Sequence, residues 1–172
     1  GRNAPSWAIY MGERESGITW HYVNAGIDEG SIIIQKRCEI GPDTKAYELA
    51  EQLMKLAYEA FVECFEDVMK ARAVTRPQPL DGTRRMYRSY EAPGDGFFEM
   101  TQEPESIYRL LRSMDYGKSN IFPPAQTVMD GKKAVILRYR KIFGDLPERK
   151  EGFCYLPMGE NTFLKLKYAN VD

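Results

Sequence analysis

One histidine and one aspartate have the residue types and the spacing for acid–base chemistry, namely His21 and Asp28. A carboxylate beside an imidazole can orient the ring or accept a proton. An aspartate set between apolar strands is partly desolvated, which raises its pKa unless a cationic partner stabilises the charge. Apolar bulk surrounds the pair and comes from Trp20, Tyr22 and Ile27. The same residues also fit an ordinary turn aspartate and a hydrogen-bonded structural histidine, so the spacing leaves both interpretations open.

Two strands and the turn between them must position this pair. Gly17 is expected to break the preceding pattern, after which the β-branched and aromatic residues 18–23 predict a strand. Residues 25–30 predict a turn that its glycines allow to be sharp. Residues 31–40 predict a second strand, and its apolar start indicates that other structure covers that end. A histidine on the first strand and an aspartate on the turn can then face each other.

One helix is expected before the two strands in the sequence, and another after them. Residues 4–12 predict a short helix, and a long one is predicted from an N-cap at Asp43-Thr44 to about Ala71. Apolar residues recur along the long helix at helical spacing, at Leu49, Leu53, Leu56, Ala60, Cys64 and Val68. We interpret it as a helix that covers the core and assign it no function.

The second half of the sequence changes to short strands separated by turns. Residues 72–82 contain two prolines and end in Asp-Gly, which predicts a linker. Strands are predicted at 84–90, 134–142 and 162–168, with turns at 93–96, 130–131 and 158–161. A helix is predicted from Pro104, with Ile107, Leu110, Leu111 and Met114 facing inward. This mixture predicts a small β-barrel-like second domain.

Composition and charge fit a folded protein of two unequal parts. Of the 172 residues, 43% are hydrophobic and 12% aromatic, whereas disordered chains are poor in such groups. The net charge of −1 argues against a uniformly basic surface for nucleic acid. Residues 1–74 carry 8 basic and 12 acidic side chains, and residues 75–172 carry 16 and 13. We therefore expect domains at 1–74 and 75–172.

Several classes of site and location are disfavoured. The cysteines at 38, 64 and 154 form no metal-binding pattern with the single histidine, so no metal is expected. Free thiols are typical of the reducing cytoplasm. No apolar run reaches the roughly 20 residues of a membrane span, and no signal peptide is visible. The sequence opens without a methionine, so we expect a piece of a longer protein, and its oligomeric state stays open.

Four stretches of the first half carry a family resemblance: residues 1–9, 12–13, 17–21 and 27–35. Their ordered run of Gly-x-Thr-x-His followed by Ile-Asp-x-Gly-x-Ile-Ile resembles the 10-formyltetrahydrofolate-dependent formyltransferase family. That family includes the methionyl-tRNA, glycinamide ribonucleotide and nucleotide-sugar formyltransferases. The resemblance implies an α/β fold, the C-terminal part of a Rossmann-like catalytic domain. It also implies that a small β-barrel-like (OB-like) α+β domain follows.

The resemblance also implies an activity, the transfer of a formyl group from 10-formyltetrahydrofolate to a primary amine. Family members use an Asn, a His and an Asp, and Asp28 matches the family aspartate. The backbone of Ala25, Gly26, Ile27 and Asp28 is implied to form half of the folate pocket. The family's Asn and His belong to a segment before Gly1, and His21 is a different family position. By this resemblance the chain on its own is expected to be inactive.

Basic residues of the second half predict a patch for a phosphate-bearing acceptor, either aminoacyl-tRNA or a nucleotide amino sugar. They are Arg109 and Arg112 on one helix face, Arg138 and Arg140 on one strand face, and Arg84, Arg85 and Arg88 as a third group. The alternative is a solvated surface of mixed charge. The sequence thus leaves two hypotheses, a formyltransferase and a non-catalytic binding or assembly module on the same scaffold.

Overall fold

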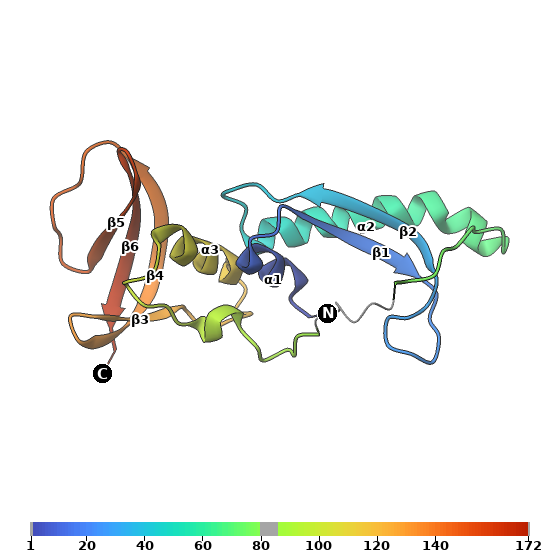
Figure 1. The fold of residues 1–172 in the computed structure, drawn as a ribbon, viewed down its shortest axis with the longest axis horizontal. Coiled ribbons are helices and arrows are strands. Elements are labelled where there is room, and N and C mark those ends of the chain that lie inside the picture. Colours follow the sequence, from blue (N-terminus) through green and yellow to red (C-terminus); the bar gives the residue numbers. More distant parts are fainter. Residues whose placement is uncertain (1, 80–85, 172) are drawn as a thin grey trace.

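The computed structural model describes residues 2–79 and 86–171. The first part contains helix α1 (Ala4–Met11), strands β1 (Glu15–His21) and β2 (Ile32–Glu39), and helix α2 (Ala46–Met69). The second part contains the short helical turn η1 (Pro93–Gly96), helix α3 (Pro104–Met114) and four strands, β3 (Gln126–Met129), β4 (Lys132–Phe143), β5 (Phe153–Gly159) and β6 (Thr162–Asn170). Figure 1 shows an elongated molecule with the β1–β2 hairpin at one end and the four-stranded sheet at the other.

Strands β1 and β2 form an antiparallel pair with α2 packed along one face (Figure 1). The core beneath is small and contains Ile9, Ala46, Leu49 and Leu53. The prediction that Gly17 breaks the pattern was wrong, because β1 begins at Glu15 and runs through it. A Cβ at Gly17 would lie 2.5 Å from the carbonyl oxygen of Lys36. The glycine therefore permits the close pairing of the strands rather than ending it.

Helix α2 begins later than expected. Its N-cap is Lys45, whose backbone N–H donates to the Glu48 carboxylate at 2.8 Å. The predicted cap residue Asp43 instead accepts a hydrogen bond from Lys141 at 2.8 Å, a partner far along the chain. Toward its C-terminal end the helix leaves two aromatic side chains, Phe61 and Phe65, exposed.

The second part is a four-stranded antiparallel sheet of order β3-β4-β6-β5 with α3 packed against it. The predicted helix is confirmed, and its inward residues Ile107, Leu110 and Leu111 are buried. Both tight turns are confirmed, with Asp130 at φ 49° and Asn161 at φ 52°. The described strands leave β3 and β5 at the edges of the sheet, so the barrel-like closure is not confirmed.

Two predictions about the connection between the parts need correction. Residues 86–90 form no strand, and Tyr87 instead stacks on Trp7 with ring centroids 3.7 Å apart. Arg84 and Arg85, which began that predicted strand, lie outside the described residues. The predicted linker is not free along its described length, since Arg76 pairs with Ile32 through two backbone hydrogen bonds of 2.7 and 3.0 Å.

Candidate functional site

The pair predicted from the sequence is assembled by the loop between β1 and β2. His21 Nε2 lies 3.7 Å from Asp28 Oδ1. His21 Nδ1 lies 2.8 Å from the carbonyl oxygen of Tyr22, so that nitrogen must carry a hydrogen to make a bond. The second nitrogen then faces the carboxylate and attracts it when the ring is protonated. The contact with the Tyr22 carbonyl oxygen thus holds the His21 ring in place, with its second nitrogen beside the Asp28 carboxylate.

Asp28 is not desolvated, which corrects the expectation from its apolar neighbours. Its side chain is 61% exposed, and its backbone has a left-handed φ of 54°. The loop doubles back tightly, because a Cβ at Gly30 would lie 1.6 Å from the carbonyl oxygen of Tyr22. The fold therefore presents this carboxylate to solvent on a shaped loop, where it can meet a ligand.

The loop residues expected to bind folate are open as well. Ala25, Ile27 and Asp28 are exposed, and no described residue hydrogen-bonds the backbone N–H of Ile27 or Asp28. The Gly26 N–H is occupied by Asn24 Oδ1 at 3.1 Å. The backbone N–H groups of Ile27 and Asp28 are thus open to solvent beside an exposed apolar side chain.

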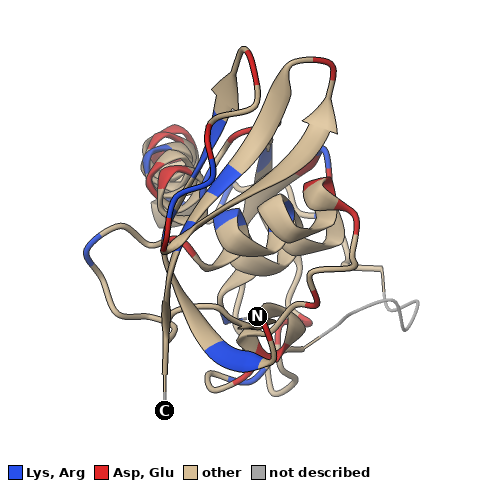
Figure 2. Ribbon diagram, turned by 90° about the vertical axis from the view of Figure 1, so that its left-hand side faces the viewer, with Lys and Arg blue, Asp and Glu red and all other residues tan. Residues whose placement is uncertain are grey.

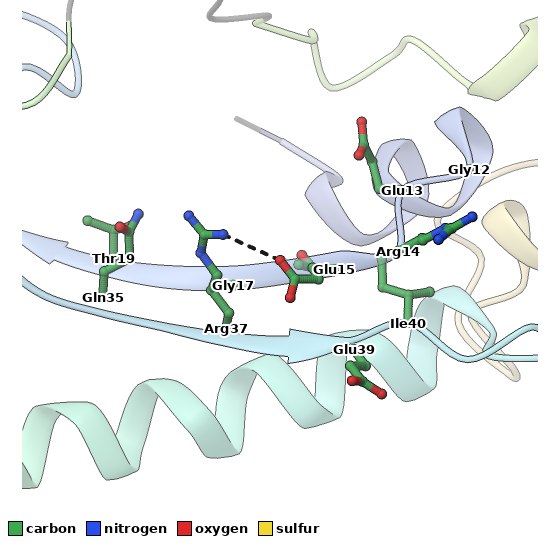
Figure 3. Close-up of a pocket in the computed structure, with 11 residues that line it drawn as sticks. Gly12, Glu13, Arg14, Glu15, Gly17, Thr19, Gln35, Arg37, Glu39 and Ile40 are labelled. Carbon is green, nitrogen blue, oxygen red and sulfur yellow. Dashed lines mark hydrogen bonds and ion pairs between the residues drawn. The ribbon is translucent and has the colours of Figure 1, made fainter.

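A broad polar groove on the face of the hairpin turned away from α2 was not anticipated (Figure 3). Its volume is about 950 Å³, and charged or polar residues line it along both strands. Figure 3 shows Arg37 donating to Glu15, with an Nη1–Oε2 distance of 3.3 Å. The sequence signal for this face was the placement of polar residues at every second position, at 15 and 19 on the first strand and at 35, 37 and 39 on the second. No described group of three or more His, Cys, Asp or Glu side chains could hold a metal ion.

The four arginines proposed for the acceptor do not form one patch. Arg112 is only 4% exposed, and its guanidinium donates to the carbonyl oxygen of Thr44 at 2.7 Å. It is a buried structural residue, so its assignment to a surface patch was wrong. Arg109 lies against Gly12 at the end of α1 and donates to Ser106 at 3.3 Å. The spacing of Arg109 and Arg112 predicts that they share a helix face, but it does not predict which other elements pack against that face.

Arg138 and Arg140 are exposed on β4 and are joined by two lysines that sequence reasoning missed. In the strand register Arg138 lies opposite Lys167 and Arg140 opposite Lys165. The four cations line a groove of about 360 Å³ that also includes Tyr139 and Phe153. We call this the cationic groove. No acidic side chain of a described residue lines this groove. Figure 2 views the molecule from this end, with Lys and Arg in blue.

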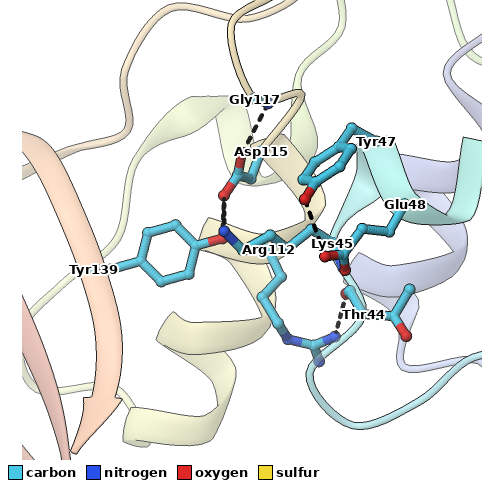
Figure 4. Close-up of polar contacts among 8 residues, drawn as sticks. All are labelled: Thr44, Lys45, Tyr47, Glu48, Arg112, Asp115, Gly117 and Tyr139. Carbon is cyan, nitrogen blue, oxygen red and sulfur yellow. Dashed lines mark hydrogen bonds and ion pairs between the residues drawn. The ribbon is translucent and has the colours of Figure 1, made fainter.

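A cluster of partly buried polar contacts joins the two parts (Figure 4). We call it the polar seam and define it as Thr44, Lys45, Arg112, Asp115 and Tyr139. Asp115 Oδ2 accepts hydrogen bonds from Tyr139 at 2.7 Å and from Lys45 at 2.9 Å. Burial opposes ionisation of Asp115, but these hydrogen bonds outweigh it and hold its pKa below the usual range.

Comparison with known proteins gives a consistent family. Residues 1–65 match the family model described as formyl transferase. The chain is 31% identical over 140 residues to the methionyl-tRNA formyltransferase of Heliobacterium modesticaldum, covering 81% of this chain and 42% of that protein. It is 32% identical over 127 residues to that of Geobacter metallireducens, covering 74% and 39%. The chain thus spans about two fifths of the length of these relatives.

Solved structures share the fold. An N-formyltransferase from Helicobacter canadensis, in complex with folinic acid and dTDP-3-aminofucose, matches with a TM-score of 0.68 at 14% identity. That match covers 97% of this chain and 61% of that one. HypX from Aquifex aeolicus, in complex with tetrahydrofolic acid, matches with a TM-score of 0.66 at 15% identity, over 96% and 29% of the chains. None of the described helices is both long and apolar enough to cross a membrane.

Proposed function

Because the chain belongs to the formyl transferase family, we propose that the intact protein transfers a formyl group from 10-formyltetrahydrofolate to a primary amine. The observation that carries this proposal is the exposed Asp28 carboxylate, held 3.7 Å from His21 within the matched residues. In the reaction the acceptor nitrogen bonds to the formyl carbon, the bond from that carbon to folate N10 breaks, and a proton moves from the amine to N10. A carboxylate at this position can accept the amine proton or hold a protonated imidazole in place.

The donor would bind at the exposed loop. In this proposal the backbone of Ala25, Gly26, Ile27 and Asp28 forms half of the folate pocket, with the N–H groups of Ile27 and Asp28 free to bind it. Two structural relatives were solved with folate derivatives. Bound there, 10-formyltetrahydrofolate supplies the formyl group. In this proposal the family's Asn and His come from outside these 172 residues, and the chain alone is inactive.

The acceptor would be a long molecule such as aminoacyl-tRNA. Arg138 and Arg140 lie on the sheet at one end of the molecule, and the Asp28 loop lies at the other (Figure 1). A ligand that touches both must span most of that length, which favours a nucleic acid over a nucleotide amino sugar. The alternative, a nucleotide amino sugar, is supported by the complex of the Helicobacter canadensis relative and would bind without the cationic groove.

The proposed protein has two parts and a cytoplasmic location. We retain a catalytic part at 1–74 and a barrel-like (OB-like) part at 75–172. The supporting observation is that β1 and β2 pair with each other, whereas β3 to β6 form a separate sheet. A cytoplasmic location is supported by three free cysteines among the described residues. The non-catalytic module draws no support from the comparisons, whose named relatives are transferases.

The test uses Asp28→Asn in the full-length protein, with formyl donor and each acceptor class assayed separately. We expect transfer to fall by orders of magnitude while folding is retained. Glu29→Gln is the matched control, because Glu29 is the exposed acidic neighbour on the same loop. Near-normal turnover in Asp28→Asn would overturn the role of this carboxylate.

A further inference from the structure

The polar seam contains charges that are costly to bury. Asp115 is 17% exposed, and Arg112 is 4% exposed with no carboxylate of a described residue within 4.0 Å. Buried charges destabilise a fold unless hydrogen bonds compensate them. Part of the compensation comes across the junction, because Thr44 and Lys45 belong to the first part while Arg112 and Asp115 belong to the second.

The seam is also well placed to fix one part against the other. Lys45 is the N-cap of α2, which carries the hairpin, and Asp115 directly follows α3. The Tyr47 backbone N–H adds a bond of 3.1 Å to the Asp115 carbonyl oxygen. Asp115 Oδ1 also accepts the N–H of Gly117 at 2.9 Å, so both carboxylate oxygens are used (Figure 4).

The third anchor connects the seam to the cationic groove. Tyr139 donates to Asp115 from β4, and its neighbours on either side in the strand are Arg138 and Arg140. Successive residues of a strand point to opposite faces, so the tyrosine anchors the inner face while the arginines project outward. A shift of the Tyr139 contact therefore moves the groove.

We propose that the polar seam is a positioning device that locks the two parts into one unit and sets the cationic groove relative to the Asp28 loop. The locking stands on the contacts alone, whereas its effect on acceptor binding rests on the proposed function. Asp115 is the positioning residue, since it joins Lys45, Gly117 and Tyr139.

The first arm of the test measures locking in the 172-residue chain. Hydrogen exchange of β1 and β2 reports unfolding of the first part, and hydrogen exchange of β4 and β6 reports the second. We expect the two transitions to coincide in the wild type and to separate in Asp115→Ala. If that variant does not fold, Lys45→Met decides, because it removes the ion pair that reaches Asp115 from the first part.

The matched control for this arm is Glu63→Gln, which breaks an exposed pair with Lys36 of 2.6 Å. Coinciding transitions in the control and separated ones in the seam variants support the proposal. Separated transitions in the wild type overturn it, as do transitions that still coincide in both Asp115→Ala and Lys45→Met.

The second arm measures positioning in the full-length protein with Tyr139→Phe. We expect KM for the acceptor to rise about tenfold, with kcat and KM for the formyl donor unchanged. A general loss of stability would not produce that split. An unchanged acceptor KM in an active enzyme overturns the positioning role. An inactive wild type instead contradicts the proposed function, and the unfolding arm still decides the locking.

Discussion

Two aspartates in this molecule have the same side chain in opposite surroundings. Asp28 is 61% exposed on a loop, with one histidine nitrogen 3.7 Å away. Asp115 is 17% exposed, accepts hydrogen bonds at 2.7 and 2.9 Å, and forms an ion pair with Lys45 at 2.9 Å. A carboxylate whose oxygens are all engaged supports the fold, whereas one left open on a shaped loop is available to a ligand. The contrast separates function from stability within one chain.

The largest effect that tests this contrast is the expected loss of formyl transfer when the Asp28 carboxylate is removed. Asp28→Asn in the full-length protein is expected to lower kcat/KM for formyl transfer by about 10²–10⁴-fold, the range for losing a general acid–base group. Its Tm should stay near that of the wild type, because surface changes usually alter stability by no more than about 0.5 kcal/mol. Enzyme kinetics measure the change in kcat/KM, and calorimetry measures the Tm. A large fall in Tm would show that Asp28 is structural.

Asp115 should show the reverse behaviour. Asp115→Ala leaves Lys45 and Tyr139 without their acceptor, and losing hydrogen bonds to a partly buried charged group costs about 1.5–3 kcal/mol. Urea unfolding of the 172-residue chain measures this loss. Glu63→Gln, at an exposed pair, is the control and should cost below about 1 kcal/mol. Equal losses in the two variants would contradict the structural role of the seam.

Acid should weaken the seam in a defined direction. The pKa of Asp115 is lowered in the folded state, so its ionised form contributes stability that is present above the unfolded pKa of about 3.9. That contribution is lost as the pH falls below this value and through the lower folded pKa. Unfolding free energies measured between pH 6 and about pH 2 should therefore fall less steeply in Asp115→Asn than in the wild type. Identical slopes would contradict the assignment.

The contrast also explains which features the sequence could predict. The turn at Asp130-Gly131 and the inward face of α3 depend on neighbours in the chain, and both are confirmed. The predictions of a helix cap at Asp43 and of an exposed Arg112 were wrong. Each side chain instead contacts a residue far away in the sequence, Lys141 for Asp43 and Thr44 for Arg112. The pairing of His21 with Asp28 was within reach because one short loop makes it.

Lys165 and Lys167 were missed for the same reason, since only the register of β4 with β6 brings them beside Arg138 and Arg140. Local patterns determine elements and tight loops. Contacts between the two halves of the chain require the packing itself.

The smallest expected effect concerns these long-range cations. Changing Lys165 and Lys167 to Gln removes two of the four cations in the groove while leaving the buried face of the sheet untouched. If the groove binds a nucleic-acid acceptor, each lost phosphate contact lowers the slope of log K against log salt by about 0.7 to 0.9. The double variant should therefore lose between about 1 and 2 units of slope, with Tm unchanged. Titrations of aminoacyl-tRNA at several salt concentrations measure it. An unchanged slope would show that the groove is a solvated surface and would favour the nucleotide amino sugar, which is short and needs no contact so far from Asp28.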